Sequence, residues 1–227
     1  MRFIKFIALC IFIFVSACAQ LPVKQNKSDE KHVSLPQSEE QSGTGETAEN
    51  IAPFVAIPRP EVESRVTIPS QARDEFSRAK QAMIKKNWKE AESILLLMTN
   101  TYPELAGVYT NLGIVYGQMG ELEKAENAYR FALKTNPMNF DAYTNLGINL
   151  REQGKFNEAE QNYLAALERW PHHQPSVLNL GILYDMYLGK LEEALAYYQL
   201  AQQLNDEEDR VLKGWIIDLQ RRLPGDN

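Results

Sequence analysis

The chain has 227 residues, 44% of them hydrophobic, which is enough for one sizeable folded domain with additional segments. Its net charge of −6 argues against a partner that is bound through a basic surface, whether nucleic acid or an acidic lipid layer. Both cysteines, Cys10 and Cys18, lie close to the N-terminus. The remainder of the chain therefore has neither a disulfide framework nor a cysteine metal site.

The N-terminal segment has the pattern of an export signal. A short basic start precedes an apolar run, residues 6–15, that is too short to span a membrane as a mature helix. The run ends in Val-Ser-Ala-Cys at residues 15–18, which resembles the cleavage box of bacterial lipoproteins. The resemblance implies a lipoprotein signal peptide over 1–18, a lipidated (palmitate-bearing) Cys18 and, because Ala19 is not aspartate, the periplasmic face of the outer membrane. The alternative is an ordinary secretory signal with a chance cysteine.

Residues 19–69 are expected to form a disordered tether. They are rich in Gln, Ser, Glu, Lys and Thr, and such a composition buries too little apolar surface to offset the entropy of ordering. Residues 51–60 differ, because they combine apolar side chains with three prolines that favour an extended chain. Two interpretations stay open for this stretch: an unstructured apolar segment, or one that docks on the folded domain as an internal ligand.

The sequence from residue 106 onward repeats itself every 34 residues. Thr-Asn-Leu-Gly-Ile at 110–114 returns at 144–148 and, with leucine first, at 178–182. Each Asn-Leu-Gly block lies within a helical pattern in which apolar residues recur three and four positions apart. Gly113 is expected where two helices cross closely, because glycine lowers helix propensity and needs such a reason. Gly120 is expected to end the first helix as a left-handed cap, and Pro137 to stop the second.

This period, with its recurring small, aromatic and proline positions, resembles the tetratricopeptide repeat (TPR). The resemblance implies an all-α fold: a right-handed solenoid of about four helix-turn-helix repeats within residues 70–227. The expected repeats are 72–105, 106–139, 140–173 and 174–208.

The two ends of the solenoid are expected to differ from its middle. The first repeat lacks the Asn-Leu-Gly block and is expected to bury Phe76, Ala79 and Met83. The fourth repeat has one extra residue, expected in its turn. A capping helix is expected over 209–223. Its predicted apolar face consists of Val211, Leu212, Trp215, Ile216, Leu219 and Leu223.

The resemblance also implies a peptide-binding groove, because the first helix of each TPR lines the concave face. The residues carried over to that groove are Thr110, Asn111, Ile114, Gln118, Thr144, Asn145, Ile148, Arg151, Leu178, Asn179, Ile182 and Met186. With Arg151 as the only cation expected there, the groove departs from the relatives that clamp a C-terminal carboxylate. An asparagine at 111, 145 and 179 would offer a row of amides to an extended chain, as in the O-linked N-acetylglucosamine transferase. The alternative is that these amides bond only to neighbouring helices.

No enzyme motif is present in the sequence, and we expect neither a catalytic residue nor a cofactor nor a metal ion. His172 and His173 are expected to be exposed residues of a turn. The function that the sequence favours is that of a protein–protein scaffold or adaptor in the bacterial envelope. The chain is similar to the envelope TPR lipoproteins that assist pilus or secretin assembly, or that serve as adaptors for proteases. The expected partners are proteins of the periplasm or outer membrane, with homodimerisation left open. The alternative is an envelope enzyme or a protein that binds peptidoglycan or sugar.

Overall fold

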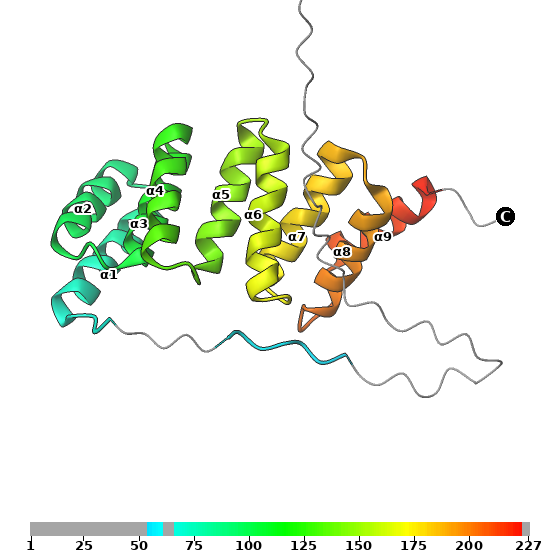
Figure 1. Cartoon of the computed structure of the whole chain (residues 1–227), viewed down its shortest axis with the longest axis horizontal. Coiled ribbons are helices and arrows are strands. Elements are labelled where there is room, and N and C mark those ends of the chain that lie inside the picture. The colour runs from blue at the N-terminus through cyan, green and yellow to red at the C-terminus, as the bar shows by residue number, and fades with distance from the viewer. Residues whose placement is uncertain (1–53, 61–65, 224–227) are drawn as a thin grey trace, which may run out of the picture. The chain divides into compact units, whose positions relative to one another are not determined.

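The computed structural model describes residues 54–60 and 66–223. The predicted signal peptide, Cys18 and most of the predicted tether lie outside the described residues. Residues 54–60 belong to no helix or strand and run as an extended segment (Figure 1). The helices are α1 (Ser70–Ile84), α2 (Trp88–Thr101), α3 (Ala106–Gln118), α4 (Leu122–Thr135), α5 (Phe140–Glu152), α6 (Phe156–Arg169), α7 (Gln174–Leu183), the π-helical turn η1 (Tyr184–Leu188), α8 (Leu191–Gln203) and α9 (Arg210–Arg222).

These helices form a solenoid of four hairpins and a final helix, α9 (Figure 1). Each helix packs on the next one along the chain, and the first helices α3, α5 and α7 also pack on one another. The first helices of successive repeats therefore share one face. Within the described ranges the chain is helical and has no strand, which confirms the predicted all-α solenoid.

Each central repeat is locked by a tyrosine that lies on a glycine. A Cβ added to Gly113 would lie closer than 3.0 Å to ring carbons of Tyr129, and one added to Gly147 would meet Tyr163 in the same way. Tyr163 is 0% exposed, so its ring has nowhere to move. The expectation that these glycines mark close helix crossings is confirmed, and the contact fixes how tightly the two helices of a repeat approach.

A residue in the left-handed region ends the first helix of every repeat. Gly120, Gly154 and Gly189 have φ values of 75°, 74° and 66°. In the first repeat the equivalent residue is Lys86, with φ 57°. A side chain in this region is strained relative to glycine, so the first repeat holds the same backbone turn at a cost.

The extra residue of the fourth repeat does not lie in the turn, where it was expected. It is accommodated within the first helix of that repeat, whose end widens into the π-helical turn η1 before Gly189. An i→i+5 turn takes in one more residue than an α-helical turn while keeping the backbone bonded. The widened turn leaves Met186 69% and Tyr187 47% exposed.

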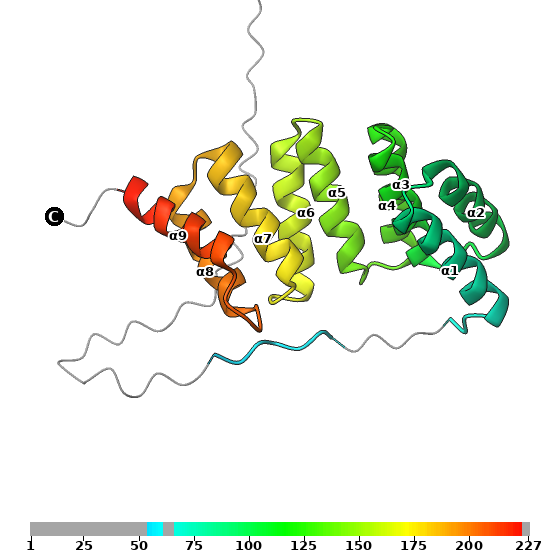
Figure 2. The same ribbon diagram turned by 180° about the vertical axis from the view of Figure 1, so that it is seen from behind.

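The C-terminal helix α9 packs on α8 (Figure 2). Leu212 and Leu219 are buried at 2% and 0% exposure, and the ring of Trp215 packs on Tyr198 with centroids 5.5 Å apart. The predicted apolar face includes one residue too many, because Val211 is 62% exposed. It lies in the first turn of α9.

The first repeat buries small residues where larger ones were expected. Helix α1 buries Ala72, Ala79 and Ala82, whereas Phe76 and Met83 are only half-buried. Phe76 instead borders a cavity on the face formed by the first helices. Among the described helices, none is both long and apolar enough to cross a membrane.

Candidate functional site

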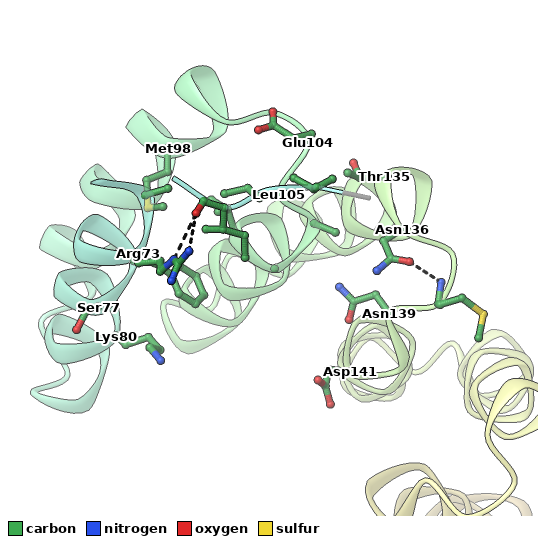
Figure 3. A pocket seen from close by; sticks show the side chains of 18 of the residues that line it. Arg73, Ser77, Lys80, Met98, Glu104, Leu105, Thr135, Asn136, Asn139 and Asp141 are labelled. Atoms are coloured by element: carbon green, nitrogen blue, oxygen red, sulfur yellow. Dashed lines mark hydrogen bonds between the residues drawn. The ribbon is translucent and has the colours of Figure 1, made fainter. Parts of the chain in front are cut away.

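A large cavity lies at the N-terminal end of the face shared by the first helices. It has a volume of about 1060 Å³ and is bordered by α1, by the turn between α2 and α3, and by the turn between α4 and α5 (Figure 3). From α1 it is lined by Arg73, Phe76, Ser77 and Lys80. These residues lie 34 positions before Gly107, Thr110, Asn111 and Ile114, so they hold the groove positions of the first repeat. The groove prediction covered only repeats two to four and missed them.

The cavity combines both signs of charge with an apolar wall. Arg73 and Lys80 contribute cations, and Glu104 and Asp141 contribute carboxylates. The guanidinium of Arg73 donates to the carbonyl of Ile68, at 3.0 Å from Nη2 and 3.3 Å from Nε, as Figure 3 shows. The ammonium of Lys80 lies 5.4 Å from the centre of the Phe76 ring. The expectation that Arg151 is the only cation of the groove is therefore wrong, because the first repeat supplies two more.

The predicted asparagine row lies on the first helices, and each amide is bonded to its own helix. Asn111, Asn145 and Asn179 donate to the carbonyl four residues earlier, at 2.8, 2.7 and 2.8 Å. The side-chain oxygen of Asn179 also accepts from Arg151 at 3.3 Å. One N–H of each amide is thus engaged locally, which leaves fewer groups for an extended chain than the resemblance implied.

Two of the predicted groove residues belong to the packing between repeats. Thr110 and Thr144 are 5% and 4% exposed, and each hydroxyl donates to the carbonyl four residues earlier. Thr110 also accepts from the amide of Asn139, which in turn caps helix α5 by accepting from the backbone N–H of Ala142. These threonines therefore fix the spacing of neighbouring repeats and are closed to a ligand.

The remaining predicted groove residues are more open. Gln118 is exposed, Arg151 is half-buried and Met186 is 69% exposed. Another half-buried set lies along the first helices: Ile114, Ile148, Leu178 and Ile182. These side chains form an apolar continuation of the face that the large cavity begins, and the assignment of this surface to peptide binding stays a prediction.

The turn between α6 and α7 holds the extended segment 54–60. The backbone N–H of Ile57 donates to Nδ1 of His172 at 2.6 Å, and its carbonyl accepts from Nε1 of Trp170 at 2.8 Å. The ring of Phe54 lies on His172 with centroids 5.3 Å apart. Of the two interpretations of residues 51–60, these contacts favour docking.

The prediction that His172 and His173 are exposed turn residues is wrong. They are 6% and 4% exposed, because segment 54–60 covers one ring while the packed helices enclose the other. Burial lowers the pKa of His172 below its usual value, since an imidazolium would lose its hydration. The hydrogen bond from His173 holds the pKa of the Asp141 carboxyl below its usual range.

A row of three polar side chains resembles a catalytic triad in its order: Asp141, His173 and Ser176. Nε2 of His173 lies 3.5 Å from Asp141, and Nδ1 lies 2.9 Å from the hydroxyl of Ser176. A nucleophile must reach its substrate, but Ser176 is 0% exposed and its hydroxyl lies 2.6 Å from that of Thr144. These contacts therefore join two repeats through the buried side chains of His173 and Ser176, while Asp141 is exposed at the surface. Within the described residues, no group of three or more His, Cys, Asp or Glu side chains could hold a metal ion.

Two models of known families match the repeated part of the chain. Residues 106–139 match a family model of the tetratricopeptide repeat, and residues 144–209 match a second model of the same repeat. The chain contains tetratricopeptide repeats. As expected of a TPR protein, it is built as a scaffold for contacts with other proteins.

Solved TPR structures share this fold. PilF of Pseudomonas aeruginosa is 24% identical with a TM-score of 0.61, covering 67% of this chain and 69% of that one. MamA of Desulfovibrio magneticus RS-1 is 19% identical with a TM-score of 0.58, covering 69% of this chain and 87% of that one. A thermophilic TPR protein of Thermus thermophilus is 21% identical with a TM-score of 0.58, covering 65% of this chain and 80% of that one. No curated protein sequence matches the chain significantly.

Proposed function

We propose that this TPR protein is a lipid-anchored scaffold of the bacterial envelope, which binds an extended segment of a partner polypeptide along the face of its first helices. In this proposal Cys18 is acylated, the tether keeps the solenoid in the periplasm at the outer membrane, and the partner belongs to an envelope complex under assembly. The lipoprotein-like pattern of residues 15–18 supports the anchor. The similarity to envelope TPR lipoproteins supports the role in assembly.

The observation that carries the binding surface is the cavity of about 1060 Å³ at the groove positions of the first repeat. Its volume lies just above the range for small-molecule sites, which is about 300–1,000 Å³. Its wall contains Arg73, Lys80, Glu104 and Asp141, so both charges are available to backbone and side-chain groups of a peptide. An open groove with mixed charge suits a segment of polypeptide better than a small apolar ligand.

The energetics favour a partner that also buries apolar surface. Three asparagine amides, at about 1 kcal/mol net for each hydrogen bond, provide about 3–6 kcal/mol, against an association cost of about 4–15 kcal/mol. Because each amide already bonds within its helix, this row alone would bind weakly. Contacts with Ile114, Ile148 and Ile182 would supply the rest, so we expect a partner segment with apolar side chains at intervals.

The binding surface can be tested by photocrosslinking in cells. A photoreactive amino acid at Lys80 or Ile148, on the face of the first helices, is expected to give a discrete crosslinked product. The matched control is Leu97, which is 61% exposed on the second helix of the first repeat. Products from Leu97 but from neither groove position would place the partner elsewhere and contradict the proposed surface.

The anchor can be tested separately. Metabolic labelling with palmitate is expected to mark the wild-type chain and leave Cys18→Ser unlabelled, and the variant is expected to leave the membrane fraction. Label retained in Cys18→Ser, or absent from the wild type in a host that processes lipoproteins, would contradict the anchor without affecting the groove.

A further inference from the structure

The turn between α6 and α7 holds a single residue of segment 54–60 by both of its backbone polar groups. Ile57 donates its N–H to His172 and receives the indole N–H of Trp170 on its carbonyl, at 2.6 and 2.8 Å. A pair of bonds of this kind recognises an extended main chain, whichever side chain it carries. Pro58 directly after Ile57 keeps the segment extended, because proline fixes its own φ and disfavours the helical conformation of the residue before it.

The side chains around Ile57 add two aromatic contacts. Phe54 lies on the ring of His172, and the guanidinium of Arg59 lies 5.8 Å from the centre of the Phe140 ring. A second cavity, of about 410 Å³, is formed where segment 54–60 meets the turn, and its solenoid side includes Phe140, Pro175 and Leu204. The receiving surface is therefore a shaped pocket that offers two ring nitrogens, one of His172 and one of Trp170.

The equivalent turns of the other repeats lack the two residues that grip Ile57. Thirty-four residues earlier, Trp170 and His172 correspond to Asn136 and Met138, in the turn between α4 and α5. The helices on either side are the same in kind, so the repeat itself does not require Trp170 and His172. His172 is 6% exposed, and its Nδ1 accepts the N–H of Ile57. This turn is specialised within a regular array.

We propose that the α6–α7 turn is a second peptide-binding site of the protein, one that takes an extended, proline-containing apolar segment, and that its resident occupant is the chain's own segment 54–60. The site lies outside the predicted groove residues of repeats two to four. It borders the groove, because Arg59 and Asp141 line both the small cavity and the large one. A free segment of the same class competes with residues 54–60 for this turn.

The occupant is held so that it can be displaced. Phe54, Val55 and Ile57 remain 43%, 75% and 46% exposed, so little of their apolar surface is removed from water. The segment stays in place chiefly because it belongs to the same chain, which gives it an effective concentration of about 1 mM. A partner segment with better side-chain contacts would replace it.

Hydrogen exchange on the full chain tests the resident contact. The amide of Ile57 is expected to exchange about tenfold or more slowly than in an unstructured peptide, because it is bonded to His172. Trp170→Phe keeps an aromatic ring and removes the indole N–H. His172→Met introduces the residue found at the equivalent position of the turn between α4 and α5. Both are expected to remove the protection. Met138→Ala, the matched control in the turn between α4 and α5, is expected to leave it unchanged.

Thermal melting of each variant separates loss of docking from loss of folding. Protection that survives both substitutions in a folded chain would overturn the proposed site. Protection that grows with protein concentration would overturn the assignment to the same chain, because the occupant would then come from a second copy.

A peptide added in trans tests the site as a receptor. Ile57→Pro removes the N–H that His172 accepts, so this full-length variant presents a vacated turn, whereas Ile57→Ala keeps the N–H. A synthetic peptide of residues 51–62 is expected to shift the indole N–H signal of Trp170 in the Ile57→Pro chain with a Kd of about 0.1 mM, because tenfold protection at an effective concentration of about 1 mM requires that affinity. In the Ile57→Ala chain, where the resident segment competes, the peptide is expected to bind about tenfold more weakly. Equal binding to both chains, or no binding to a folded Ile57→Pro chain, would overturn the proposal. Neither result depends on the proposed groove or its partner.

Discussion

The turns at 136–139 and 170–173 occupy the same place in successive repeats, yet they do different things. Each begins after a helix that carries a tyrosine over a glycine, and each has proline at its second position. In the first, Asn139 bonds to Thr110 and caps α5. In the second, His173 takes the place of Asn139 and bonds to Ser176, while Trp170 and His172 grip another part of the chain. These two repeats thus keep the same contact between their helices and differ in their turns.

The largest effect on stability is expected from loss of the glycine–tyrosine contact that precedes both turns. Gly147→Ala would place a methyl group against the ring of Tyr163, which is 0% exposed, and should lower the free energy of unfolding by about 2–3 kcal/mol. Gly113→Ala should cost nearly as much through Tyr129. Chemical denaturation measures both. An effect below about 0.5 kcal/mol at both positions would mean that the glycines do not set the helix crossing.

Loss of the Asn139 cap of α5 tests whether the two turns are independent. Asn139→Ala removes the bond to Thr110 and the acceptor for the N–H of Ala142, so it should lower the free energy of unfolding by about 1–2 kcal/mol. Because residue 139 belongs to the plain turn, hydrogen exchange at Ile57 should not change. A loss of protection at Ile57 in a chain that is still folded would show that the two turns are coupled.

The pH dependence should differ between the two turns. Nδ1 of His172 accepts a hydrogen bond only while the imidazole is neutral, and burial lowers its pKa from the ordinary 6.5. Docking of segment 54–60 is therefore at full strength above pH 6.5 and weakens as pH falls through the lowered pKa of the docked state. The protection factor at Ile57 should decrease several-fold between about pH 7 and about pH 5.

Other ionisable groups lie near this turn, so a control is needed. His173, Asp141 and Arg59 surround the site. His172→Gln keeps an acceptor that does not titrate, and it should flatten the pH profile if His172 is responsible. A profile that stays steep in this variant would assign the dependence to a neighbouring group.

The smallest change in the free energy of unfolding is expected at the ends of the first helices, where equivalent positions can again be compared. Lys86 holds the left-handed conformation that glycine holds at 120 and 154. Lys86→Gly should raise the free energy of unfolding by about 0.5–1 kcal/mol, because relief of the strain exceeds the added entropy of the unfolded chain. Gly120→Ala should change it by a similar amount in the opposite direction. A loss of stability in Lys86→Gly would contradict the strain.

The features predicted from sequence were those that recur. The glycine at 113 and 147 and the cap at 120 could be recognised because the same residue returned after 34 positions in a pattern that only helix packing explains. The buried state of His172 had no such signal, since its partner Ile57 lies 115 residues away in the chain. The extra residue of the fourth repeat was counted correctly, but the sequence does not say whether a turn or a helix takes it in. The groove positions of the first repeat were missed because that repeat lacks the Asn-Leu-Gly block that marks the others.

The π-helical turn η1 has a consequence for how a long partner would settle on this protein. A strictly periodic receptor offers several equivalent resting places, each displaced by one repeat, and a bound chain could slip from one to the next. The widened turn at Tyr184–Leu188 occurs once among the described repeats and exposes Met186 and Tyr187 there. It removes the translational degeneracy of the array, so that one alignment of the partner differs in energy from every shifted one.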